Sequence, residues 1–145
     1  MSTLVTLIAI VALQAQAPAP RTITIGIDDS MKYSVTAITA RPGETVRVVL
    51  ESTSTMPKRA MAHNFVLLAA GTNAAAFVKQ GQNNRDTDFI PPAQKGKVLA
   101  MTALAGPAET VEVTFTVPAK PGKYEFICTF PGHYTLGMKG VLTVR

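Results

Sequence analysis

The segment CTFPGHYTLGM, residues 128–138, carries the side chains that decide how this chain folds and what it can hold. It contains the only cysteine of the 145 residues, one of the two histidines and a methionine. Pro131-Gly132 supplies turn residues inside it. We therefore predict a hairpin in which Cys128 ends one strand, His133 lies in the turn and Met138 begins the next strand. A loop of this length can fold three ligands around a single point.

The other histidine, His63, begins a short apolar run in MAHNFVLL, residues 61–68. Two imidazoles, one thiolate and a distant thioether are the trigonal set with a weak axial sulfur that marks a blue-copper electron-transfer site. Thiolate and thioether suit Cu(I), and imidazole serves both oxidation states. A lone histidine or methionine is usually ordinary packing, so the argument depends on their combination. A structural zinc site can use the same cysteine and histidines, and it stays an alternative.

The rest of the chain reads almost entirely as strands separated by Pro and Gly turns. Residues 110–117, TVEVTFTV, alternate with period two, as a strand with one buried face does. The remaining predicted strands are 22–27, 45–51, 64–68, 123–129 and 140–144. β-Branched content and spacing predict an all-β sandwich of about seven or eight strands.

One insertion interrupts this pattern at residues 71–97. Residues 73–80, NAAAFVKQ, are good helix formers and precede Gly81, which we expect to end the helix. A polar stretch and Pro91-Pro92 follow. We predict a flap with one short helix outside the sandwich.

The N-terminus has the features of an export signal. Residues 4–13 are apolar, and Ala15-Gln16-Ala17 is a small-x-small cleavage pattern. The apolar run is shorter than the roughly 20 residues that span a bilayer. We expect residues 1–17 to be a signal peptide and 18–145 the exported domain, in the periplasm. The alternative is a retained anchor, which would place the domain at the outer face of the cytoplasmic membrane, or a floppy tail.

Charge and composition argue against several partners and activities. The formal net charge of +5 is scattered, and the chain has no tryptophan, so we expect no nucleic-acid partner. A copper oxidase or reductase needs further copper centres, and both histidines are already used here. We therefore expect no enzyme and no organic substrate. A copper-storage protein remains the second candidate, although its usual methionine clusters are absent because the methionines here are dispersed.

Four segments together resemble the azurins and auracyanins, the small bacterial cupredoxins. They are 30–40 (SMKYSVTAITA), 61–68 (MAHNFVLL), 102–115 (TALAGPAETVEVTF) and the ligand loop CTFPGH followed by MKG at 138–140. The resemblance implies a cupredoxin-like Greek-key β-sandwich with one copper per chain. It further implies a monomer that shuttles single electrons between redox partner proteins, such as cytochromes or respiratory and photosynthetic complexes.

The resemblance also implies roles for single residues. It gives His63, Cys128, His133 and Met138 as the copper ligands. It gives Asn64 as the residue that joins the two ligand loops by hydrogen bonds, and Ala62, where azurins have glycine, as a possible weak carbonyl contact. It implies an apolar docking patch around His133, formed by Met31, Met61, Phe130, Pro131 and Leu136. We expect Lys58, Arg59 and Lys139 to form a basic rim that steers an acidic partner.

Two departures from the azurin pattern leave the subgroup open. Four residues separate His133 from Met138, one more than in azurin, and this spacing is similar to that of auracyanin. The azurin disulfide is missing, because Cys128 is alone.

Overall fold

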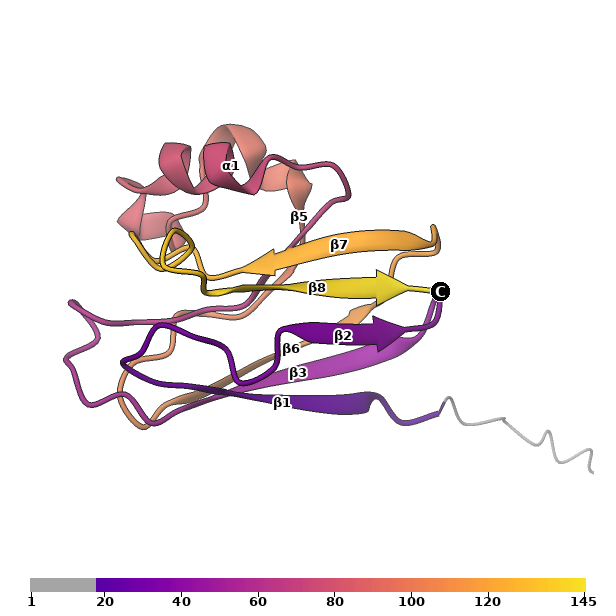
Figure 1. Ribbon diagram of the computed structural model, residues 1–145, viewed down its shortest axis with the longest axis horizontal. Helices are drawn as coiled ribbons and strands as arrows, with labels where there is room; N and C mark the ends of the chain where they lie inside the picture. The colour runs from indigo at the N-terminus through magenta and orange to yellow at the C-terminus, as the bar shows by residue number, and fades with distance from the viewer. Residues whose placement is uncertain (1–17) are drawn as a thin grey trace, which may run out of the picture.

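The computed structural model describes residues 18–145; the predicted signal peptide, residues 1–17, lies outside the described residues. In the described part, eight strands form two sheets and one α-helix lies outside them. The predicted β-sandwich with a helical flap is therefore confirmed, and Figure 1 shows its two layers. The strands are β1 (Arg21–Ile27), β2 (Ala37–Ala40), β3 (Thr45–Ser52), β4 (Val66–Leu68), β5 (Val98–Met101), β6 (Thr110–Thr116), β7 (Gly122–Ile127) and β8 (Lys139–Val144).

The first sheet has the order β1-β3-β6, with β1 parallel to β3 and β3 antiparallel to β6. The second has the order β2-β8-β7-β4-β5, in which β2 runs parallel to β8 and the other pairs are antiparallel. The period-two pattern explains the pairing, because alternate residues such as Ile25 and Leu50 are buried between the sheets. Two sheets that each bury one face make one shared core.

Aromatic side chains fill the centre of that core. Phe65 lies between Phe115 of the first sheet and Phe126 of the second, with ring centroids 6.3 and 5.0 Å away. Tyr33 contacts Phe126 at 5.6 Å. Cys128 and Met138 belong to the same buried cluster, so the interior of the sandwich is continuous with the place where the predicted ligands lie.

The flap differs in detail from its prediction. Helix α1 covers Ala74–Gly81, and the side chain of Asn73 caps it by accepting the backbone N–H of Ala76 at 3.0 Å. Gly81 is the last helical residue and not the cap after it. Two 3₁₀ helices follow, η1 (Arg85–Thr87) and η2 (Pro92–Lys97).

Two strands also depart from their predictions. Strand β5 had no predicted counterpart, because its four residues directly follow the flap and are too few to show a period. β4 is shorter than the predicted run 64–68, since His63 forms only an isolated bridge with Ala105.

The loops that carry the candidate ligands meet at one end of the sandwich. Figure 1 shows the β7–β8 loop at the left, on the same end as the long connection after β3, with the C-terminus at the opposite end and α1 above β7. No helix among residues 18–145 is long and apolar enough to cross a bilayer.

Candidate metal centre

Backbone hydrogen bonds fix the loop between β7 and β8. The N–H of Cys128 donates to the carbonyl of Met138 at 3.1 Å, which closes the loop at its base. The His133 N–H donates to Phe130, and the Met138 N–H donates to His133, so the loop folds back on itself. Gly132 and Gly137 adopt φ of 87° and 96°, values that few other residues reach without strain. Glycine at these two positions allows the tight turns that aim the side chains inward.

His63 lies in the loop between β3 and β4, and hydrogen bonds hold both its backbone and its ring. Its backbone exchanges two hydrogen bonds with Ala105, at 3.0 and 2.7 Å. Its ring Nε2 lies 3.2 Å from the hydroxyl of Ser54. A ring nitrogen held in this way leaves Nδ1 to face the interior of the site.

Four donor atoms converge at this point. His63 Nδ1 lies 3.3 Å from Met138 Sδ, and Cys128 Sγ lies 3.5 Å from His133 Nδ1. The donor atoms of the two histidines and the cysteine lie within 4.8 Å of one another. All four side chains are buried. Ligands to one ion at about 2.0–2.3 Å are roughly 3.5–4 Å apart, so these donor atoms lie close to the separations that one metal ion requires.

The ionisation of the two histidines is compatible with metal binding. Burial lowers the pKa of His133 to about 4, with His63 adding to the shift. Burial also lowers the pKa of His63, against the opposing charges of Asp29 and Asp28. Both imidazoles are therefore neutral and offer lone pairs at physiological pH.

The pKa of the Cys128 thiol shifts in the opposite direction. Burial raises the pKa of Cys128 to about 12, although the backbone N–H groups of Asn64 and Phe130 donate to its sulfur and lower it in part. The thiolate is therefore not favoured in this site without a positive charge beside it. Such a group is completed by a cation that replaces the proton. Soft sulfur with imidazole nitrogen suits copper.

Asn64 lies beside the ligands and links the two loops. It is fully buried, its Nδ2 donates to Thr129 Oγ1 at 2.8 Å, and its Oδ1 accepts the Thr129 N–H at 2.9 Å. The Tyr33 hydroxyl donates to the carbonyl of Asn64 at 2.5 Å. Ala62 is fully buried next to His63, and its carbonyl contact stays a prediction.

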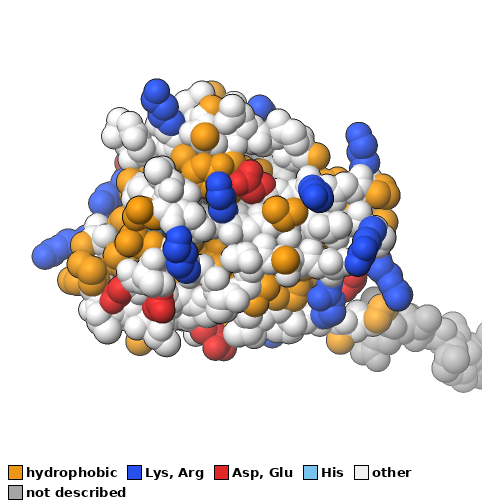
Figure 2. Space-filling view, in the orientation of Figure 1, with side chains coloured by type: hydrophobic (Ala, Val, Ile, Leu, Met, Phe, Trp, Pro, Cys, Tyr) orange, Lys and Arg blue, Asp and Glu red, His pale blue; other side chains and the backbone are white. Residues whose placement is uncertain are grey.

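The residues predicted to form the docking patch differ in exposure. Leu136 is 53% exposed and Pro131 is exposed, while Met31 is half-buried. Met61 and Phe130 are each only 8% exposed. His133 is 3% exposed, and His63 is fully buried. Figure 2 shows apolar side chains gathered at the left end, where the β7–β8 loop lies, with Lys and Arg among them.

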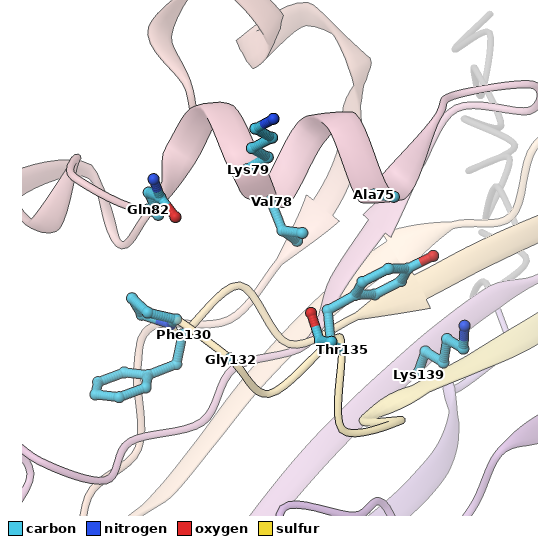
Figure 3. Close-up of a pocket in the computed structure, with 10 residues that line it drawn as sticks. Ala75, Val78, Lys79, Gln82, Phe130, Gly132, Thr135 and Lys139 are labelled. Atoms are coloured by element: carbon cyan, nitrogen blue, oxygen red, sulfur yellow. The ribbon is translucent and has the colours of Figure 1, made fainter.

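A cleft of about 520 Å³ adjoins this loop. It lies between α1 and the segment from Phe130 to Lys139, and Figure 3 shows Val78 pointing from α1 toward the loop while Lys79 points away from it. Lys79 and Lys139 are its charged lining residues, and neither forms an ion pair within the described part of the chain. Lys139 lies 4.6 Å over the ring of Tyr134. Of the predicted rim, Lys58 is instead paired with Glu109 at 2.6 Å.

Sequence reasoning missed three contributors to this site. Ser54 carried no signal, because a serine at the end of a strand is usually a solvated turn residue. Asp88 and Phe89 come from the flap, for which we predicted only a place outside the sandwich. The Thr129 hydroxyl donates to the carbonyl of Asp88 at 2.7 Å, and the rings of Phe89 and Phe130 meet edge to face at 5.2 Å.

Comparison with known proteins agrees with this geometry. The family model of copper binding proteins, plastocyanin/azurin family, matches residues 21–145. Auracyanin-B from Chloroflexus aurantiacus is 40% identical over 117 residues, which cover 80% of this chain and 48% of auracyanin-B. Azurin from Pseudomonas aeruginosa is 36% identical over 121 residues, covering 81% of this chain and 80% of azurin. The chain therefore spans about half the length of auracyanin-B and most of azurin.

A solved structure extends the match to three dimensions. Auracyanin A, a blue copper protein from the green thermophilic photosynthetic bacterium Chloroflexus aurantiacus, superposes on this chain with a TM-score of 0.77 at 35% identity. The match covers 88% of this chain and all of that structure. Fold, donor set and sequence agree, and the chain belongs to the plastocyanin/azurin family of copper-binding proteins.

Proposed function

We propose that this chain is a one-electron carrier whose single copper is held by His63, Cys128 and His133, with Met138 as the weak axial ligand. The observation that carries the proposal is the convergence of four buried donors from two loops, with 3.3 and 3.5 Å between neighbouring donor atoms. Copper, when bound, supplies the reversible Cu(II)/Cu(I) couple.

The protein's own contribution is a site that resists rearrangement. The Ser54 hydroxyl holds the far nitrogen of His63, and the Asn64 amide holds Thr129 next to Cys128. Burial of all four donors keeps water away from them. Since neither loop has to move when the charge of the site changes, electron transfer is not slowed by reorganisation.

A storage role has less support. Within residues 18–145, His63, Cys128 and His133 form the one close group of metal-ligating His, Cys, Asp or Glu side chains. A storage protein gains from several exposed sites, whereas this group is buried and provides for one ion.

Electrons would pass through His133, which is the outer of the two histidines. Exposed Leu136 and Pro131 flank it, so a partner can meet this end without removing water from charged groups. Lys79 and Lys139 of the neighbouring cleft extend the predicted basic rim and would steer an acidic redox protein. Such contacts favour a short-lived complex of a monomer with its partners. We further propose export to the periplasm, from the signal-like residues 1–17.

The function is tested by anaerobic redox titration of the copper-loaded protein. We expect one electron per chain, taken up and released over repeated cycles with the copper retained. Loss of copper on reduction, or a metal that undergoes no reduction, would contradict the carrier role and favour storage or a zinc site.

A further inference from the structure

The flap outside the sandwich contacts the two residues that follow Cys128 through the pair Asp88-Phe89, between η1 and η2. These neighbours have φ of 52° and 61°, a left-handed conformation that is uncommon for a residue other than glycine and unusual for a bulky phenylalanine. Strain of this kind persists where the surroundings impose it, and it gathers at functional sites. The pair therefore calls for a physical reason.

The surroundings that impose this conformation can be named. The Asp88 N–H donates to the carbonyl of Arg85 at 3.1 Å, and the Phe89 N–H donates to that of Asn84 at 2.8 Å. Gly81 at the end of α1 lies directly against the pair, because a Cβ there would come within 2.0 Å of the Phe89 carbonyl oxygen. These contacts within the flap hold the backbone of Asp88 and Phe89 rigidly in place.

The first contact of the pair is a directed chain of hydrogen bonds. The Thr129 hydroxyl has one proton, and the Asp88 carbonyl, 2.7 Å away, can only accept it. The hydroxyl in turn accepts from Asn64 Nδ2 at 2.8 Å. The chain therefore runs from Asn64 through Thr129 to the flap, and it fixes the residue that follows Cys128.

The second contact is between rings. Phe89 is only 3% exposed, and its ring meets Phe130 edge to face at 5.2 Å. The Phe130 ring lies 4.8 Å from that of His133. Arg85 covers the outer side of Phe89 at 5.7 Å. A rigid flap residue thus fixes the ring of Phe130, which in turn packs on the ring of His133.

We propose that Asp88 and Phe89 are positioning residues that set the reduction potential of the copper site from the flap. This inference rests on the proposed function, since it concerns the same copper. By holding Thr129 and Phe130, the pair keeps the Phe130 ring over His133 and closes this side of the site to water. The apolar shell around such a site controls its access to solvent and therefore its potential. A dry shell disfavours the higher charge of Cu(II) and so favours Cu(I).

The main test replaces the ring while keeping an apolar side chain. In Phe89→Leu the Phe130 ring is less well fixed over His133, so more water reaches the site. Water stabilises the higher charge of Cu(II), so the potential falls. We expect the ratio of reduced to oxidised protein at a fixed ambient potential to drop at least threefold, about 28 mV for a one-electron couple. Thr129→Val, which cannot donate to Asp88, should shift the ratio the same way, and Thr129→Ser should restore it.

Phe77→Leu is the matched control. Phe77 is a fully buried phenylalanine of the same flap, but it packs in a separate cluster with Val66 and Leu68. We expect it to lower the melting temperature as Phe89→Leu does and to leave the potential unchanged. Equal shifts in Phe77→Leu and Phe89→Leu, or a potential unaltered by Phe89→Leu and Thr129→Val, would overturn the inference. The wild-type protein separates the two proposals: if it is not blue with Cu(II), the proposed function itself fails.

Discussion

His63 Nδ1 lies 3.3 Å from Met138 Sδ, although 75 residues separate them in the chain. His63 lies in the connection after β3, and Met138 is the last residue before β8. The two sheets bring these loops to one end of the sandwich, so the contact forms only when the whole fold is in place. The fold therefore brings together donors that lie far apart in the chain.

We expect replacement of the predicted axial ligand to change the reduction potential while copper stays bound. A thioether is a weak donor that stabilises Cu(II), so Met138→Leu should remain blue and become easier to reduce. We expect the reduced-to-oxidised ratio at a fixed ambient potential to rise about tenfold, or about 59 mV. Spectroelectrochemical titration measures it. An unchanged potential, or loss of all copper, would remove Met138 from the ligand set.

The amide of Asn64 contributes to stability through two buried hydrogen bonds to Thr129. Asn64→Ala leaves their partners unpaired, at a cost of about 2–4 kcal/mol in the free energy of unfolding. Asn73→Ala is the control, since it removes only the cap of α1 and should cost about 1 kcal/mol. Urea denaturation of the metal-free variants compares them. Equal losses would mean that Asn64 does not join the loops.

The exposed apolar side chain at the ligand end is expected to lie in the contact between proteins. Leu136→Glu places a charge there, and electron self-exchange should slow by about tenfold with the visible spectrum intact. Leu99→Glu adds the same charge at another exposed leucine, on β5, and should have little effect. Nuclear magnetic resonance line broadening measures both rates. If the two variants behave alike, the electron leaves through another surface.

The lysines of the cleft should steer anions toward His133. We expect Lys79→Glu with Lys139→Glu to slow oxidation of the reduced protein by hexacyanoferrate(III) about fivefold at low ionic strength, with the effect lost at high salt. Lys120→Glu with Lys123→Glu makes the same change in net charge at the start of β7, far from the ligand loop along the strand. If the stopped-flow rates of the two double variants coincide, only the net charge of the protein affects the oxidation rate.

The fold class followed from the sequence because its signals are local. The alternation in 110–117 and the turn residues between strands specify which face is buried, and the structure confirms the sandwich. Strand ends were less accurate: β4 lacks residues 64 and 65, and the Phe65 N–H donates to the side chain of Thr102 instead of to a strand backbone. β5 was missed because four residues are too short to show a period.

The candidate metal-binding residues could be predicted from the sequence for a different reason: cysteine and histidine are rare in this chain. One cysteine and two histidines leave few combinations. What surrounds them was not accessible, because the contacts of Asp88 with Thr129 and of Phe89 with Phe130 join segments about 41 residues apart through a backbone carbonyl and a ring edge. Neither group has a sequence pattern that marks its partner.

The most direct test of the account is the visible and electron paramagnetic resonance spectrum of the protein with one equivalent of Cu(II), recorded beside that of Cys128→Ser. The wild-type protein should show an intense red-orange absorption with a small copper hyperfine splitting, since that combination requires a Cu(II)–thiolate bond. The variant should fold, lose the band and bind Cu(II) far more weakly. A colourless wild-type protein, or a Cys128→Ser protein that is still blue, would contradict the assignment of Cys128 as the copper thiolate.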